Sequence, residues 1–99
     1  MYKLYFPNDT LKERDDIIIW YAEQSEQATD NFIKEFDETV NKICLNPFRY
    51  RNVYKNYREV KMKTFPYHIV YGVNEKEKEV SILRIYHTSR NPKIKYRNF

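Results

Sequence analysis

The side chains best suited to phosphate chemistry gather in the second half of this sequence. Lys61, Lys63 and His68 lie in two neighbouring segments of alternating polar and apolar residues, which would place them on one face of a hairpin. Imidazole can move a proton near neutral pH, cationic groups neutralise phosphates, and aromatic rings stack on bases. A second set follows the last apolar segment and comprises His87, Arg90, Lys93, Lys95, Tyr96 and Arg97. Both sets indicate contact with a nucleic acid.

Each of these features also has a purely structural interpretation. Strand histidines such as His68 and His87, set among tyrosines and isoleucines, commonly serve as half-buried packing residues. The basic C-terminal segment can equally be a frayed terminus without a ligand. The residue types alone leave both interpretations open.

Metal, cofactor and nucleophilic chemistries find little support. The two histidines and the single cysteine are far apart and lack the spacing of metal ligands. The sequence has no glycine-rich phosphate loop, nucleophile elbow or paired-carboxylate motif, so no cofactor is expected. Cys44 and Trp20 fall on apolar helical segments and are predicted to be core residues.

Cysteine usage and hydropathy bear on the compartment. A lone thiol fits a reducing environment, and residues 1–7 lack the basic start and apolar stretch of a secretory signal. The longest apolar run, Ile17 to Ala22, is far shorter than the roughly 20 residues that span a bilayer. We therefore expect a cytoplasmic protein without a membrane segment.

Charge is distributed unevenly along the chain. Residues 8–41 hold ten acidic and three basic side chains, whereas residues 42–99 hold fourteen basic and four acidic ones. This asymmetry predicts an acidic solvated layer opposite a basic surface suited to phosphates. An ordinary surface of mixed charge is the alternative.

Two helices are predicted after a short strand at residues 2–6. Thr10 and Glu13 match a capping box, which indicates that the apolar run at residues 17–21 belongs to a helix rather than to a buried strand. A second helix should begin at Ser25 and stop at Asn46-Pro47. Its apolar positions recur every three or four residues at Ala28, Phe32, Phe36, Val40 and Ile43.

Three strands are predicted in the basic half of the chain. A basic loop at residues 48–56 is followed by alternating segments at residues 57–63 and 67–73. A polar turn at residues 74–78 then leads to a final strand at residues 79–87, which is apolar on both sides and therefore expected to be central.

The apolar pattern also predicts how the first two of these strands pair. Pairing Val60 with Ile69 places the large apolar side chains on one face and sets Lys61 opposite His68 on the other. The element order is β-α-α-β-β-β. This order predicts a single α+β domain over residues 1–99, with two helices packed on one face of a small, mainly antiparallel four-stranded sheet.

Element order and three segments resemble the RelE/ParE toxin superfamily over nearly the whole chain. The segments are Asn46-Pro47, the pair Tyr57-Arg58-Glu59-Val60 and Tyr67-His68-Ile69-Val70-Tyr71, and Val80-Ser81-Ile82-Leu83-Arg84-Ile85-Tyr86-His87-Thr88-Ser89-Arg90. In the last segment, an arginine three residues after a histidine is similar to the strand ending of ParE-like members. The resemblance implies the toxin of a type II toxin–antitoxin pair, which is held inactive by a cognate antitoxin.

The resemblance also implies a site on the open face of the sheet. Lys61 matches a strand lysine of RelE-like members, whereas Glu59 stands where another lysine is expected. His68 replaces an arginine of the middle strand. Arg90 and Tyr96 match the arginine after the last strand and the C-terminal tyrosine.

The roles implied for these residues are those of a metal-independent, ribosome-associated endoribonuclease that cleaves messenger RNA. Such cleavage by a 2′-hydroxyl needs a base, cations for the phosphorane and a donor for the leaving oxygen. We expect His68 or Lys61 as base, Lys63 and Arg90 at the phosphate, Tyr96 or His87 in proton transfer or stacking, and Arg58, Lys93, Lys95 and Arg97 in further nucleic-acid contacts.

Two other functions remain possible from the sequence. ParE-like members of the superfamily poison DNA gyrase without catalytic activity of their own, and Glu59 and His68 in place of basic groups favour this alternative. A plain RNA-binding module or an inactive relative is the third.

Overall fold

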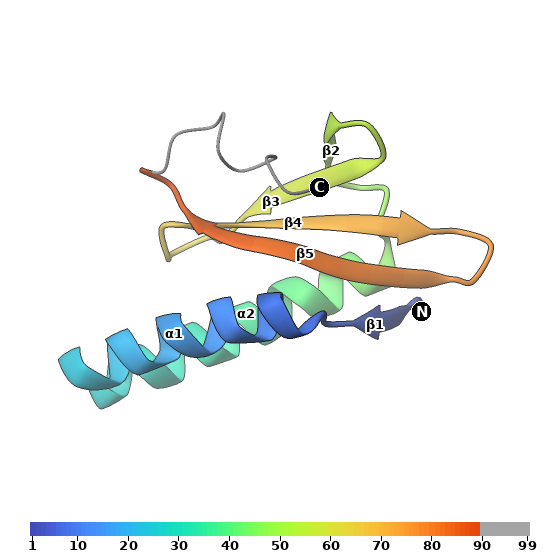
Figure 1. Ribbon diagram of the computed structural model, residues 1–99. Helices are drawn as coiled ribbons and strands as arrows, with labels where there is room; N and C mark the ends of the chain where they lie inside the picture. Colours follow the sequence, from blue (N-terminus) through green and yellow to red (C-terminus); the bar gives the residue numbers. More distant parts are fainter. Residues whose placement is uncertain (90–99) are drawn as a thin grey trace.

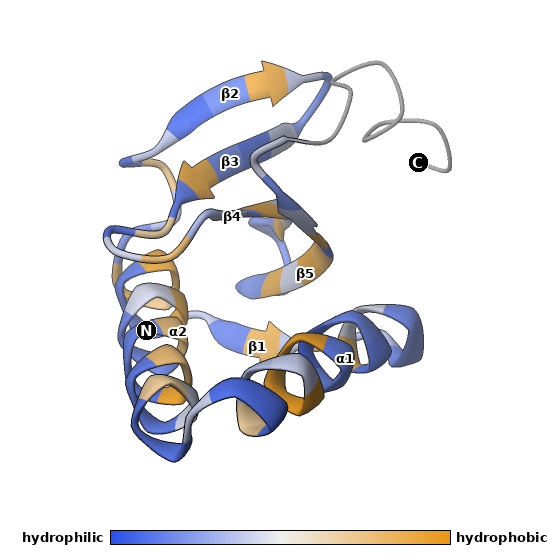
Figure 2. Ribbon diagram, turned by 90° about the vertical axis from the view of Figure 1, so that its left-hand side faces the viewer, coloured by the Kyte–Doolittle hydropathy of each residue, from blue (hydrophilic) through white to orange (hydrophobic). Residues whose placement is uncertain are grey.

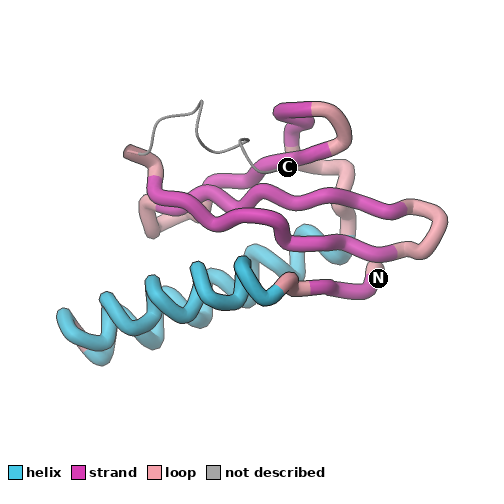
Figure 3. The backbone as a smooth tube through the Cα atoms, in the orientation of Figure 1, coloured by secondary structure: helices cyan, strands magenta, loops and turns pink. Residues whose placement is uncertain are grey.

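The computed structural model describes residues 1–89, which form two helices and a five-stranded sheet (Figure 1). In chain order the elements are β1 (Lys3–Tyr5), α1 (Asn8–Gln24), α2 (Glu26–Leu45), β2 (Arg51–Tyr54), β3 (Tyr57–Lys61), β4 (Tyr67–Asn74) and β5 (Glu79–His87). The two helices lie side by side beneath one face of the sheet, and the other face carries no helix of the described chain (Figures 1 and 3). The predicted α+β class is confirmed.

The sheet has the strand order β1-β5-β4-β3-β2, in which β1 runs parallel to β5 and all other pairs are antiparallel. The central position predicted for the last strand is therefore confirmed. Val60 pairs with Ile69 and Lys61 with His68, so the predicted register of this hairpin is also confirmed. This register matters for function because it sets Lys61 beside His68 on the open face.

The hydrophobic core lies between α2 and the helix-facing side of the sheet. Ser25 caps α2 through its Oγ, which accepts a hydrogen bond from the amide of Ala28 at 3.2 Å. From this start the helix buries one apolar stripe (Figure 2), which consists of Phe32, Phe36, Val40, Ile43 and Cys44. The opposing sheet residues include Ile69, Tyr71 and Ile82.

The start of α1 differs from the predicted capping box. The helix begins at Asn8 after Pro7, and no side chain caps it. Thr10 and Glu13 instead reach β5: the Thr10 hydroxyl donates to the carbonyl of Ile82 at 2.7 Å, and a Glu13 carboxylate oxygen accepts from the amide of Ile85 at 3.1 Å. Because β1 is short, β5 extends beyond it, and these side chains satisfy the edge that β1 leaves uncovered.

The predicted four-stranded sheet has a fifth strand, β2, within the segment expected to be a loop. It pairs with β3 at the edge of the sheet, with a bulge between Asn52 and Tyr54. Its polar, basic sequence lacks the apolar alternation of a half-buried strand because an edge strand with little burial does not need it.

The prediction that Trp20 is a core residue is wrong. Its side chain lies on α1 and is 53% exposed, and that of Ile19 is 57% exposed. Ile17, Ile18 and Tyr21 pack against the core instead. With 3.6 residues per turn, five successive apolar residues spread around the helix, so only part of the run can face the sheet.

Within residues 1–89, no helix is long and apolar enough to cross a membrane.

Candidate functional site

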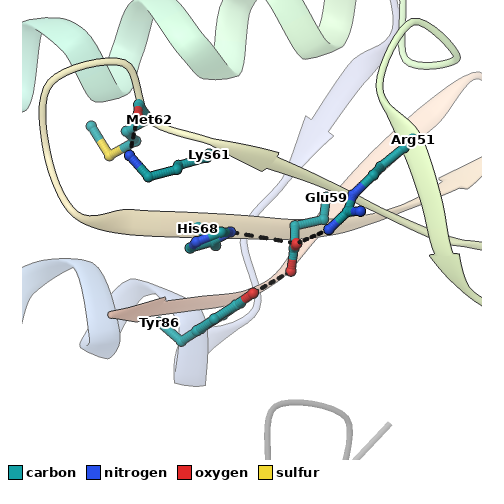
Figure 4. A network of polar contacts seen from close by, with 6 residues as sticks. All are labelled: Arg51, Glu59, Lys61, Met62, His68 and Tyr86. Carbon is teal, nitrogen blue, oxygen red and sulfur yellow. Dashed lines mark hydrogen bonds and ion pairs between the residues drawn. The ribbon is translucent and has the colours of Figure 1, made fainter. Parts of the chain in front are cut away.

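The carboxylate of Glu59 is the centre of a polar network on the open face of the sheet. Its side chain, on β3, is only 2% exposed. The hydroxyl of Tyr86 on β5 donates to Oε1. Oε2 lies 3.4 Å from Nη2 of Arg51 on β2 and 3.4 Å from Nδ1 of His68 on β4. Four strands therefore contribute one side chain each (Figure 4).

His68 lies between the carboxylate and an aromatic ring. Its imidazole stacks on the ring of Tyr86, with 4.8 Å between ring centroids and 13° between planes, and its side chain is 18% exposed. The 3.4 Å separation from Glu59 is an ion-pair distance, longer than a well-formed hydrogen bond. A carboxylate on this side favours a proton on Nδ1, which leaves the lone pair of Nε2 to accept another proton.

Lys61 lies directly across from His68 on the neighbouring strand. Its ammonium group donates to the carbonyl of Met62 at 3.4 Å and points toward the end of β3 (Figure 4). Lys63 lies beyond the end of β3, in the exposed turn that leads to β4. The structure therefore brings Lys61 and His68 together and places Lys63 at the rim.

His87 does not join this group. It pairs with Tyr67 at the end of β5, and the two rings meet edge to face at 5.3 Å between centroids. Because successive strand residues point to opposite faces, His87 lies on the helix-facing side, whereas its neighbour Tyr86 lies beside His68. Its Nδ1 is 2.8 Å from the Oγ of Ser89.

Arg58, predicted to contact nucleic acid, is half-buried and braces the segment before β2. Its guanidinium donates to the carbonyl of Tyr50 at 2.7 Å and to that of Phe48 at 3.4 Å. It also lies 5.1 Å from the centre of the Phe48 ring. The remaining predicted site residues, Arg90, Lys93, Lys95, Tyr96 and Arg97, lie outside the described residues.

Chemically, the network offers a buried carboxylate 3.4 Å from an imidazole, and Lys61 is paired with that histidine on the neighbouring strand. Sequence reasoning placed Lys61 and His68 correctly on one face, but gave no role to Arg51, Glu59 or Tyr86. A signal for Glu59 existed in the register, since it lies on the same face as Lys61 and diagonal to His68. Tyr86 could not be assigned without the register of β5.

Among residues 1–89, no group of three or more histidine, cysteine, aspartate or glutamate side chains is arranged to hold a metal ion. The donors gathered at the site are one carboxylate and one imidazole.

Comparison with known sequences identifies one family. The model of the family described as the ParE toxin of the type II toxin–antitoxin system parDE matches residues 4–92. Among curated protein sequences, none is significantly similar to this one.

Solved structures show the same fold. The chromosomal ParDE toxin–antitoxin system from P. aeruginosa includes a chain with a TM-score of 0.74 and 19% identity, with 90% of this chain and 98% of that chain covered. The isolated E. coli RelE toxin has a TM-score of 0.63 and 14% identity, with 97% and 94% covered. A chain of the intact E. coli RelBE toxin–antitoxin complex has a TM-score of 0.63 and 15% identity, with 91% and 100% covered.

Proposed function

The chain belongs to the ParE toxin family of type II toxin–antitoxin systems, and we propose that it acts as a metal-independent endoribonuclease on messenger RNA at the ribosome. The observation that carries this proposal is the Glu59–His68 pair, with Lys61 across from the imidazole. The fold alone does not select the reaction, because function depends on the site.

In the proposed reaction, Nε2 of His68 removes the proton from a ribose 2′-hydroxyl. The 2′-oxygen forms a bond to the adjacent phosphorus, and the bond from phosphorus to the 5′-oxygen of the next nucleotide breaks. The products are a 2′,3′-cyclic phosphate and a 5′-hydroxyl, so atoms and charges balance once the leaving oxygen takes up a proton. Glu59 stabilises the imidazolium formed, as a carboxylate does beside a catalytic histidine.

Cations would stabilise the charge that develops on the phosphorane. Lys61 is the described candidate, since its flexible side chain starts directly opposite His68. Lys63 and Arg90 are proposed to assist at the phosphate. We assign the proton for the leaving oxygen to Tyr96 rather than to His87, because His87 lies on the other face of the sheet.

The test is cleavage of a defined messenger RNA on purified ribosomes, read by primer extension. We expect His68→Ala to slow cleavage at least about 100-fold, the usual contribution of a general base. Lys34→Ala, an exposed lysine on α2, is the control and should cleave normally. Intact message with the unmodified chain, or unchanged cleavage by His68→Ala, would overturn the proposal.

A gyrase poison is the second candidate, and the buried charge of Glu59 favours it. A carboxylate that occupies the centre of the open face reduces the positive potential available to a phosphate. This candidate predicts DNA breaks and blocked supercoiling by purified gyrase without loss of RNA. Measuring RNA integrity and DNA damage in the same induced cells distinguishes the two.

We also propose that the chain binds a cognate antitoxin. This proposal is supported by the family match and by the similarity in fold to chains of the RelBE complex and the ParDE system. Expression of the chain alone should arrest growth, and co-expression of the neighbouring gene should restore it. An inactive relative would not arrest growth.

A further inference from the structure

The guanidinium of Arg51 is the exposed cation of the Glu59 network. The side chain of Arg51 is 75% exposed, whereas that of Glu59 is only 2% exposed. Within residues 1–89, the guanidinium contacts Oε2 of Glu59 through Nη2, at 3.4 Å. A guanidinium carries five N–H donors in one plane, and this contact occupies one edge of it. Arg51 can therefore donate to a second anion from the solvent side while it stays beside Glu59.

The hairpin of β2 and β3 fixes the position from which this side chain extends. Arg51 is paired with Glu59 across the two strands, and directly opposed residues share one face of a sheet. The Asn52 side chain closes the hairpin by donating to a backbone carbonyl of its turn at 2.7 Å. Arg58 braces the segment before β2 by donating to the carbonyl of Tyr50 at 2.7 Å. The backbone of Arg51 is thus held in place before a ligand arrives, which lowers the entropy lost on binding.

Arg51 and His68 approach the same carboxylate oxygen from different strands. Nη2 of Arg51 and Nδ1 of His68 each lie 3.4 Å from Oε2 of Glu59, so the two nitrogens are at most twice that distance apart (Figure 4). In the proposed reaction, the imidazole removes the proton of a 2′-hydroxyl that attacks the adjacent phosphorus. The attacked phosphate must therefore lie close to His68, and Arg51 is near enough to reach its non-bridging oxygens.

Arg51 is better placed for this contact than Lys61. The ammonium group of Lys61 donates to the carbonyl of Met62 and points toward the end of β3 (Figure 4). A guanidinium can also donate to two phosphate oxygens at once, whereas an ammonium group acts as a point charge. Because the carboxylate of Glu59 is buried, an incoming phosphate meets the exposed guanidinium rather than the carboxylate.

We propose that Arg51 is a catalytic residue of the endoribonuclease, and that its guanidinium binds the non-bridging oxygens of the cleaved phosphate. Its N–H groups donate more strongly as the 2′-oxygen bonds to phosphorus and negative charge accumulates on these oxygens. Arg51 keeps its protons throughout, since a guanidinium is not deprotonated in proteins, so another group supplies the proton of the leaving 5′-oxygen. This inference rests on the proposed function and adds Arg51 to the residues that touch the substrate.

The first test measures the rate at which a defined message is cut on ribosomes saturated with the protein. Arg51→Ala should lower this rate about 100-fold, the usual contribution of one donor to a transition-state oxyanion. Arg51→Lys keeps the charge without the planar set of donors and should give an intermediate rate. Lys76→Ala, which removes an exposed positive charge between β4 and β5, is the matched control and should cleave as the parent does.

A second measurement distinguishes contact with the phosphate from a structural role of Arg51 beside Glu59. Sulfur replaces one non-bridging oxygen at the cleavage site, and both diastereomers are assayed. In one diastereomer, sulfur should slow the parent but not Arg51→Ala, because that variant has already lost the contact. If Arg51 acts only by holding Glu59, sulfur slows both proteins equally, and that result would contradict the proposal. Circular dichroism verifies folding, and Arg51→Lys replaces Arg51→Ala in the comparison if the latter is unfolded.

Binding measurements show which proposal fails if no message is cut. The full chain carrying His68→Ala is titrated into a fluorescein-labelled single-stranded RNA, and the Kd is read by fluorescence anisotropy at several salt concentrations. Adding Arg51→Ala should weaken binding and reduce the salt slope by about one, whereas adding Lys76→Ala should change neither.

The two assays together separate the possible failures. If the salt slope falls with Arg51→Ala but the unmodified chain cuts no message, the phosphate contact stands, and both the endoribonuclease proposal and the catalytic role of Arg51 fail. If message is cut and Arg51→Ala alters neither the cleavage rate nor the salt slope, the assignment of Arg51 fails alone.

Discussion

At the scale of single residues, Glu59 places a carboxylate where solvent hardly reaches. Its oxygens are compensated by the hydroxyl of Tyr86, the guanidinium of Arg51 and the imidazole of His68. Buried charged groups persist in proteins when such partners are available. Because the Arg51 side chain is 75% exposed, solvent screens its ion pair with Glu59. The hydrogen bond from Tyr86 therefore stabilises the carboxylate more.

Removing this carboxylate should destabilise the fold. Glu59→Ala leaves the buried hydroxyl of Tyr86 without its acceptor, which we expect to lower the free energy of unfolding by about 1–3 kcal/mol. Glu59→Gln keeps an acceptor oxygen and should cost less. Urea denaturation gives both values. Glu38→Ala, at an exposed position on α2, is the control and should change stability by less than about 0.5 kcal/mol. Equal midpoints for Glu59→Ala and Glu38→Ala would contradict the prediction.

Tyr71 is a second buried polar residue with a defined partner, since its hydroxyl donates to the carbonyl of Pro47. Burial raises the pKa of Tyr71. The folded state therefore favours the neutral phenol. The stability that Tyr71 contributes in this way is fully present below the pKa of tyrosine in the unfolded chain, about 10. Stability should fall as pH rises above that value, because only the unfolded chain then ionises readily.

Tyr71→Phe tests this linkage. The variant should lose about 1–3 kcal/mol at neutral pH because the Pro47 carbonyl loses its donor. Its stability should also fall less steeply above pH 10 than that of the parent, as measured by urea denaturation at a series of pH values. Parallel curves for the two proteins at alkaline pH would show that Tyr71 is not the group responsible.

At the scale of elements, a carboxylate of α2 holds the turn between β3 and β4. Glu35 accepts from the amide of Thr64 at 3.0 and 3.2 Å. Burial alone would raise the pKa of Glu35, but the amide donors of Thr64, Phe65 and Lys63 outweigh it and lower the pKa below its usual value. This contact positions the turn that carries Lys63.

Acidification should release this turn. The pKa of Glu35 is lower in the folded chain than in the unfolded chain. Its contribution to the free energy of unfolding is therefore present above the unfolded pKa of about 4.3 and is lost as pH falls through the folded pKa. Glu35→Gln should cost about 1 kcal/mol at neutral pH and should make stability less dependent on pH in the acidic range. Urea denaturation from neutral to acidic pH measures both effects, and an unchanged acid limb would contradict the assignment.

The junction of α1 with β5 is the other element-scale contact that the sequence did not predict. Thr10 is fully buried and donates to the carbonyls of Ile82 and Leu83. Thr10→Val keeps the shape but leaves these carbonyls with one donor fewer, and we expect a loss of about 1–2 kcal/mol in thermal or urea unfolding. Thr88→Val, at an exposed position, should have no measurable effect. If Thr10→Val leaves the free energy of unfolding unchanged, solvent replaces the hydroxyl as the donor to these carbonyls.

At the scale of the whole molecule, one core joins both helices to the sheet, so the chain should unfold as a single unit. Trp20, the one tryptophan of the sequence, reports on α1, and far-ultraviolet circular dichroism reports on all elements. The two signals should give coincident urea transitions. Earlier loss of the tryptophan signal would show that α1 detaches before the sheet unfolds.

Charge also acts at this scale. The predicted acidic half of the chain is the helical layer, whereas the open face of the sheet presents Arg51 and Lys61. This layering matches the asymmetry of the sequence, in which basic residues predominate after residue 41. Glu59 is one of the four acidic residues after residue 41, and its buried carboxylate distinguishes this site from a uniformly cationic surface.

The sequence by itself determined the α+β class, the capped α2 with its buried stripe, the central position of β5 and the pairing of Lys61 with His68. These features follow from periodicity and caps, which are local, and from burial of one strand face, which leaves a single register for the β3–β4 hairpin.

Only the tertiary structure decided the rest. It showed that Thr10 and Glu13 bind β5 rather than cap α1, that Trp20 is exposed, and that the basic segment before Tyr57 contains an edge strand. The Glu59 network draws on four consecutive strands between residues 51 and 87, and no local pattern specifies which side chains of separate strands will meet. Contacts of this kind depend on the register and curvature of the whole sheet, and these are set by packing rather than by any single segment.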